Sequence, residues 1–76
     1  MDKVVFYERG MNEIQGRYDL VKRLIVEGEC KVAMSVYHEV AAYLQFMWNI
    51  GLIGYEEYLQ LYGVHNDNFD VLFGIC

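Results

Sequence analysis

The stretch from Cys30 to Ile53 constrains this chain most, because it carries more apolar surface than one neighbouring element can cover. Drawn as a helix at about 100° per residue, its apolar side chains fill an arc roughly 200° wide. The arc comprises Val32, Ala33, Met34, Val36, Tyr37, Val40, Ala41, Tyr43, Leu44, Met47, Trp48 and Ile50. An ordinary surface helix buries a stripe about half as wide. The stretch therefore predicts a helix over about residues 30–50 that packs against at least two other elements.

The size of the chain favours self-association. A chain of 76 residues forms one domain, residues 1–76, whose single core is thermodynamically marginal without a disulfide, a metal or a second copy. A hydrophobic content of 55% suggests more apolar surface than one copy can hide. We therefore expect a homodimeric helical bundle.

The first 28 residues contain a regular apolar seam. Its members are spaced four, three, four, three and four residues apart, and they are Tyr7, Met11, Ile14, Tyr18, Val21 and Ile25. This spacing is typical of one narrow helix face that meets a partner helix, and it predicts a helix over about residues 4–27. Gly10 is expected to mark a break in it. In the alternative, residues 3–8 form a short strand paired with residues 70–75, but the seam favours the helix.

Glycines divide the rest of the chain. Gly28 suits the left-handed position after a helix, and a connection this short makes the two long helices antiparallel neighbours. Gly51 and Gly54 bracket a turn, and a short third helix is expected over about residues 55–62, ended by Gly63. Residues 64–68 then read as a polar loop and residues 69–76 as an apolar tail. The predicted fold is all-α, an antiparallel helical hairpin plus a short third helix.

The charge pattern argues against direct nucleic-acid binding. All six basic residues lie in the first 31 positions, so the net charge of −5 arises from residues 32–76. Phosphate binding needs clustered Lys and Arg, which the aromatic half lacks. This acidic half could instead imitate DNA, but its five acids are sparse for that role.

The two cysteines, Cys30 and Cys76, do not form a secreted-type framework and are expected to be free thiols in a reducing cytosol. Charged residues follow Met1, so no signal peptide is expected. The charge-free run from Val40 to Gly54 is too short for a membrane span. The predicted location is cytoplasmic.

No catalytic or metal motif is apparent, so we expect a protein that is not an enzyme and has no cofactor. His65 to Asp70 resembles a calcium loop but lacks its glycine and terminal glutamate. Ser35 and His38 share a helix face, yet nothing predicts an oxyanion donor or a pocket beside them. A polar loop and a solvated helix face are the favoured interpretations.

The aromatic residues provide the better functional indication. Phe46 lies at the edge of the polar arc, where packing within one chain does not require an aromatic side chain. Tyr43, Met47 and Ile50 lie beside it on the helix surface, and aromatic residues and methionine are enriched in interfaces. The predicted interface comprises Val36, Val40, Tyr43, Phe46, Met47 and Ile50. A secondary partner surface is predicted at Glu39, Tyr55, Glu56, Glu57, Tyr58 and Tyr62.

These features favour a non-enzymatic protein-interaction module that binds itself and another protein. The alternatives are a small structural subunit of a larger complex and, less favoured, a bundle enzyme that binds a cofactor or metal. Such an enzyme needs ligands inside the apolar arc, where only Cys30 qualifies.

The run Gly51-Leu52-Ile53-Gly54-Tyr55-Glu56-Glu57-Tyr58 resembles a "G-L-I-x-x-E-E-Y/F" turn and short helix in small open reading frames of phages and mobile elements of Gram-positive bacteria. The resemblance covers eight of the 76 residues. It implies an accessory protein that inhibits or redirects a host factor, such as a restriction or CRISPR component. It carries over no binding residues.

Overall fold

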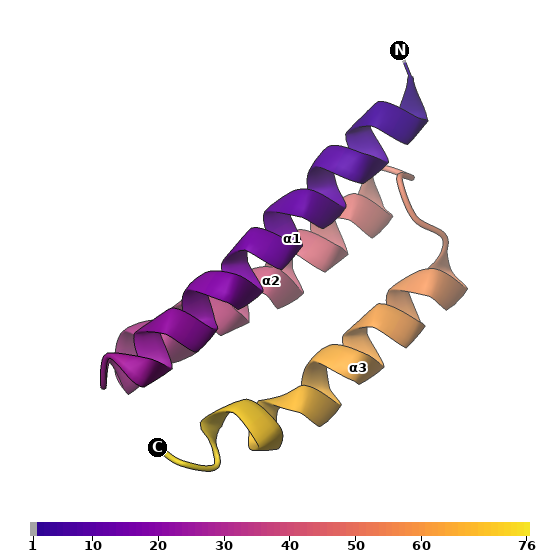
Figure 1. Cartoon of the computed structure of the whole chain (residues 1–76). Helices are drawn as coiled ribbons and strands as arrows, with labels where there is room; N and C mark the ends of the chain where they lie inside the picture. Colours follow the sequence, from indigo (N-terminus) through magenta and orange to yellow (C-terminus); the bar gives the residue numbers. More distant parts are fainter. Residues whose placement is uncertain (1) are drawn as a thin grey trace.

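The computed structural model describes residues 2–76, which form three helices (Figure 1). Helix α1 spans Lys3–Val26, α2 spans Cys30–Asn49 and α3 spans Tyr55–Phe73. In Figure 1, α1 and α2 lie side by side and antiparallel, and α3 returns along them toward the connection between the two. Residues 2–76 contain no strand, so the all-α prediction is confirmed and the alternative sheet is wrong.

Gly28 and Gly51 close their helices in the same way. Their φ angles are +82° and +80°, in the left-handed region that favours glycine. The N–H of Gly28 donates to the carbonyl of Ile25, and the N–H of Glu29 donates to that of Leu24. Gly51 repeats this pattern after α2. Both turns therefore satisfy carbonyls that a helix end leaves without partners, and they reverse the chain within a few residues.

The predicted seam of α1 faces α2. Ile14 and Val21 are buried within it, and its other four members are half-buried. The seam packs on a row of buried α2 side chains, which are Ala33, Tyr37, Val40, Leu44 and Met47. This apolar contact along the length of both helices forms the core of the fold.

Gly10 lies inside α1 and does not break it, so the predicted break is wrong. A Cβ at this position would lie 2.7 Å from Cε and 2.9 Å from Sδ of the buried Met47 side chain. The absence of a side chain at Gly10 therefore makes room for Met47 between the two helices. Gly16, six residues later, has no such neighbour within 4 Å.

Helix α3 is longer than predicted. It continues through Gly63 to Phe73, so the expected end at Gly63, the polar loop over residues 64–68 and most of the apolar tail are wrong. His65, Phe69 and Phe73 follow one another at four-residue spacing, and their rings all lie against Tyr37 of α2. Burial of these rings compensates the roughly 1 kcal/mol that glycine costs in a helix interior.

Cys30 and Cys76 form a disulfide, with their Cα atoms 6.1 Å apart, so the prediction of two free thiols is wrong. The return of α3 brings the two residues together across 46 positions of sequence. Disulfides persist mainly in oxidising compartments, so the bond removes the thiol argument for a cytoplasmic location. That location stays a prediction.

The charge-free run from Val40 to Gly54 is divided between the end of α2 and the turn before α3. Of the helices described between residues 2 and 76, none combines the length and the hydrophobicity needed to cross a bilayer.

Alanine substitutions at the two α1 glycines should have unequal effects on stability. Gly16→Ala should stabilise the protein by about 0.5–1 kcal/mol, because alanine is the better helix former and meets nothing. Gly10→Ala should lose most or all of this gain, because the end of the Met47 side chain must first move away from the new Cβ. Urea denaturation followed by circular dichroism measures both. Equal stabilisation by the two substitutions would contradict the close approach at Gly10.

Reduction of the disulfide should lower stability. Its loop of about 46 residues restricts the unfolded chain, and its loss is expected to cost about 2–4 kcal/mol. Thermal denaturation of the oxidised protein with and without a phosphine reductant measures the effect. Cys76→Ser is the control, since its melting temperature should be low and insensitive to the reductant. Identical melting temperatures for the oxidised and reduced protein would refute the expectation.

Candidate interaction surface

One flank of α2 carries a row of side chains that α1 and α3 leave partly uncovered. We call this row the outer stripe, and its members are Val32, Val36, Glu39, Tyr43, Phe46 and Ile50. Phe46 is 56% exposed, Ile50 53% and Val32 48%. Helix α3 packs on the other flank of α2, where its rings stack on Tyr37 and Trp48. The outer stripe is therefore the largely apolar flank of α2 that its two neighbours cover only in part.

The interface predicted from the sequence overlaps the outer stripe only in part. Val40 and Met47 are 0% and 1% exposed in the single chain, where they pack with Ile14, so the prediction that they remain for a partner is wrong. Both residues lie on the α2 face that meets α1. Val32 was missed, although it precedes Val36 by four residues and so continues the same row.

Two hollows follow the outer stripe on its α1 side. The first, of about 450 Å³, lies beside Phe46 and Ile50 and is lined from α1 by Phe6, another exposed aromatic that the sequence analysis missed. The second, of about 340 Å³, lies beside Val36 and Glu39. Its α1 wall includes Gly16 and Leu20. Apart from the adjoining part of α1, nothing lies within 4 Å of the position that a Cβ of Gly16 would take, so the hollow is open on this side.

Arg17 of α1 binds the polar centre of the outer stripe. Its Nη1 lies 2.7 Å from a carboxylate oxygen of Glu13, and its Nε lies 3.5 Å from one of Glu39. Its guanidinium also lies over the ring of Tyr43, 5.4 Å from the centroid. The hydrogen bond to Glu13, followed by the charges of both carboxylates, raises the pKa of Arg17. Glu39 and Tyr43 are thereby held beside the same cation.

The fold divides the secondary partner surface predicted from the sequence, since three of its six residues are half-buried and three are exposed. The Tyr7 hydroxyl donates to Glu57 at 2.6 Å, and this bond raises the pKa of Tyr7. Tyr58 stacks on Trp48 with ring centroids 4.7 Å apart. Tyr62 is half-buried beside Tyr58, whereas Tyr55, Glu56 and Glu39 are exposed. These residues thus do not form one continuous exposed surface.

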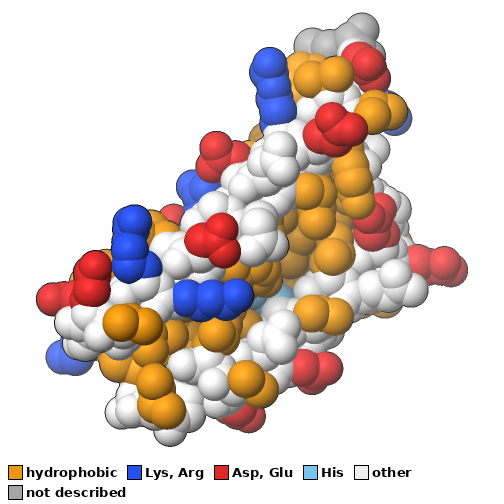
Figure 2. All heavy atoms as spheres, in the orientation of Figure 1, with side chains coloured by type: hydrophobic (Ala, Val, Ile, Leu, Met, Phe, Trp, Pro, Cys, Tyr) orange, Lys and Arg blue, Asp and Glu red, His pale blue; other side chains and the backbone are white. Residues whose placement is uncertain are grey.

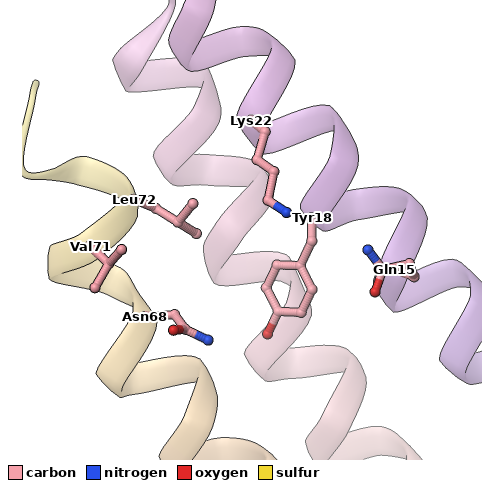
Figure 3. Close-up of a pocket in the computed structure, with 6 residues that line it drawn as sticks. All are labelled: Gln15, Tyr18, Lys22, Asn68, Val71 and Leu72. Atoms are coloured by element: carbon pink, nitrogen blue, oxygen red, sulfur yellow. The ribbon is translucent and has the colours of Figure 1, made fainter.

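A separate groove lies between α1 and α3. Figure 2 shows hydrophobic side chains gathered between these two helices, with charged side chains along the outside. One part of the groove, about 430 Å³ in volume, is shown in Figure 3 and is lined by Gln15, Tyr18, Lys22, Asn68, Val71 and Leu72. Lys22 is the one charged side chain in this lining.

His65 is the buried polar residue at the junction of the three helices. It is 2% exposed, its ring stacks on Tyr37 with centroids 3.9 Å apart, and its Nδ1 is hydrogen-bonded to the Tyr18 hydroxyl at 2.7 Å. The Tyr37 hydroxyl donates to the His65 carbonyl. Burial and, second, the nearby His38 lower the pKa of His65, while burial and then Tyr37 raise the pKa of Tyr18 to about 12. His65 is therefore neutral at pH 7 and ties α3 to α1 and α2.

The structure brings no catalytic set together at the residues the sequence singled out. Ser35 donates a long hydrogen bond to the carbonyl of Lys31, and His38 lies against Phe69. Within residues 2–76, no three His, Cys, Asp or Glu side chains are grouped so that they could hold a metal ion.

Comparison of the chain with models of protein families, with curated proteins and with solved structures gives no match.

Acidification should destabilise the fold through His65. Because the folded pKa is lowered, the unfolded chain takes up the proton at the higher pH. The stability contributed by neutral His65 is thus complete above the unfolded value of about 6.5 and is lost as the pH falls through the lowered folded pKa. Urea midpoints measured between about pH 7.5 and pH 5 should fall accordingly.

The matched variants separate this effect from other titrations. His65→Phe keeps a ring against Tyr37 but cannot titrate, so it should be less stable at neutral pH and less sensitive to acid. His38→Gln changes an exposed histidine and should keep most of the pH dependence. An unchanged pH dependence in His65→Phe would rule out His65 as the cause.

Proposed function

We propose that the chain is a non-enzymatic protein-interaction module that associates with a second copy through the outer stripe. The observation that carries the proposal is the exposure of Val32, Phe46 and Ile50 on one flank of one helix. Large contiguous apolar patches are uncommon on monomers and typically mark interaction sites. Aromatic residues such as Phe46 and Tyr43 are enriched in the cores of such interfaces.

The size of the core supports the same proposal. The fully buried hydrophobic residues form two small clusters around Leu44 and Tyr37, whereas large apolar side chains stay exposed on all three helices. Chains of this length gain little stability from a single core, and burial of the outer stripe in a dimer would add to it. Self-association therefore serves the fold as well as the interface.

A host factor as a second partner remains part of the proposal, motivated by the resemblance of residues 51–58 to phage and mobile-element proteins. Helix α3 contains four acids and no Lys or Arg, and Glu56, Asp67 and Asp70 are exposed on it. A partner with a basic surface would complement this helix.

Dimerisation should depend on the outer stripe. Light scattering on a sizing column should give twice the chain mass of 8.9 kDa at micromolar concentration. The double variant Phe46→Gln with Ile50→Gln should raise the dimer dissociation constant by about tenfold or more, because it removes two apolar contacts.

The control for this experiment lies on α3. Leu59 and Val64 are 49% and 58% exposed, so Leu59→Gln with Val64→Gln removes two similarly exposed apolar side chains away from the outer stripe. This pair should leave the dissociation constant unchanged. A monomer at every concentration, or equal weakening by the two double variants, would refute the proposal.

A further inference from the structure

The spacings between the six residues of the outer stripe are symmetric about residue 41 of α2. Its members lie in pairs at equal distances from residue 41, nine residues away for Val32 and Ile50, five for Val36 and Phe46, and two for Glu39 and Tyr43. Two copies of α2 laid antiparallel about a two-fold axis at that level would bring each residue opposite the other member of its pair. Any six-residue helical row with alternating four- and three-residue spacing has this symmetry, including the α1 seam. The spacing therefore defines one antiparallel register, and the side-chain chemistry of the pairs is what favours it for an isologous interface.

The chemistry of the three pairs fits this antiparallel arrangement. Val32 would meet Ile50, and Val36 would meet Phe46, so that four of the six positions bury apolar surface on apolar surface. Glu39 would meet Tyr43, which pairs a carboxylate acceptor with a hydroxyl donor. No hydrogen bond to the Tyr43 hydroxyl is formed within residues 2–76. A parallel arrangement would instead place Glu39 opposite Glu39, which like charges disfavour.

The hollow beside Val36 is placed to receive Phe46 of a second copy in the same pairing. Phe46 projects from the surface, and the residue opposite it in the antiparallel arrangement, Val36, borders the hollow of about 340 Å³. Gly16 lies in the wall of that hollow with open space where a side chain would be. A Phe46 ring from a second copy would therefore pack on Val36, Leu20 and the open space at Gly16. The ring would also be bordered by the polar side chains that line the same hollow, which are Asn12, Glu13, Arg17 and Glu39.

Arg17 places charge at the centre of the arrangement. It holds Glu39 by an ion pair and lies over the Tyr43 ring, and these two residues flank residue 41 on either side. At the two-fold axis, each Glu39 carboxylate would keep its own Arg17 and accept the Tyr43 hydroxyl of the other copy. The Glu39 carboxylates and Tyr43 hydroxyls would then be paired across the axis while the apolar ends are buried, although Arg17 Nε itself has no hydrogen-bond partner within the described chain.

We propose that two copies of this chain pair α2 against α2, antiparallel and centred at residue 41, with the Phe46 ring of each copy in the hollow beside Val36 and Gly16 of the other. This arrangement rests on the proposed function, since it presupposes that the outer stripe binds a second copy. It goes further by specifying the register, the orientation and the residue pairs.

Exchange of charges across the two ends tests the orientation. Val32→Glu puts an acid near the start of α2 and Ile50→Lys puts a base at its end, where the helix dipole favours each charge. Each single variant leaves a charge against an apolar residue of the second copy and should weaken the dimer by about tenfold or more. In the double variant, the acid and the base of opposite copies meet at both ends, so much of the affinity should return.

The rescue cannot arise within one chain. Positions 32 and 50 are separated by 18 residues of helix, about 27 Å at 1.5 Å per residue. A parallel pairing would oppose like charges at each end and give no rescue. A double variant that dimerises no better than the worse single variant overturns the register.

A second variant pair tests the hollow. Gly16→Leu places a side chain in it and should weaken the dimer by about tenfold or more while keeping a folded, helical chain, because leucine is the better helix former and nothing outside the adjoining part of α1 lies within 4 Å of the Cβ position at Gly16. Gly63→Leu makes the same change at an open helical position of α3 and should leave the dissociation constant unchanged. Equal dimerisation of the two variants overturns the docking of Phe46 in the hollow.

The outcomes separate this proposal from the one on which it rests. A chain that is monomeric at every concentration overturns both. A dimer that is weakened by Phe46→Gln with Ile50→Gln, but not rescued by Val32→Glu with Ile50→Lys, overturns the antiparallel register and leaves the function in place. The full arrangement is supported if Val32→Glu with Ile50→Lys restores dimerisation and if Gly16→Leu weakens the dimer whereas Gly63→Leu does not.

Discussion

The burial of Tyr37 is the interaction on which the arrangement of the three helices depends. Its side chain is 1% exposed, packs with Val21 of α1 in the same cluster, and stacks on His65 of α3. Phe69 and Phe73 contact the same ring edge-on. Aromatic contacts of this kind contribute beyond the area that they bury. Without this ring, α3 would lose the central part of its contact with α2.

The packing around Tyr37 determines which part of α2 is free to act. Helix α1 packs on the face with Val40 and Met47, and α3 packs on the flank with Tyr37 and Trp48, so the opposite flank stays partly exposed. The functional proposal follows from this division of one helix surface among its neighbours. The reactive side chains do not support this proposal, because they have structural roles. The buried His65 joins α3 to α1, and the disulfide links the end of the chain to α2.

The sequence predicted the parts of the fold that depend on local periodicity. Six seam residues at alternating spacing located α1, and Gly28 located its end, because both depend on residues close together in the chain. Helix α3 is longer than the sequence predicts, because Gly63 lies inside the helix and does not end it. The spacing from His65 through Phe69 to Phe73 was an available indication that the helix continues, but its weight depended on a partner ring in α2.

The amino-acid sequence by itself determined that α2 has more apolar surface than one helix can cover, that Phe46 lies at its polar edge, and that α1 is an antiparallel neighbour. Only the tertiary structure decided that Val40 and Met47 belong to the core, that Phe6 and Gly16 border the outer stripe, and that Cys30 meets Cys76. The physical reason is that periodicity specifies the width of an apolar face, whereas the rotation of each helix about its axis is set by close packing against the others, as at Gly10.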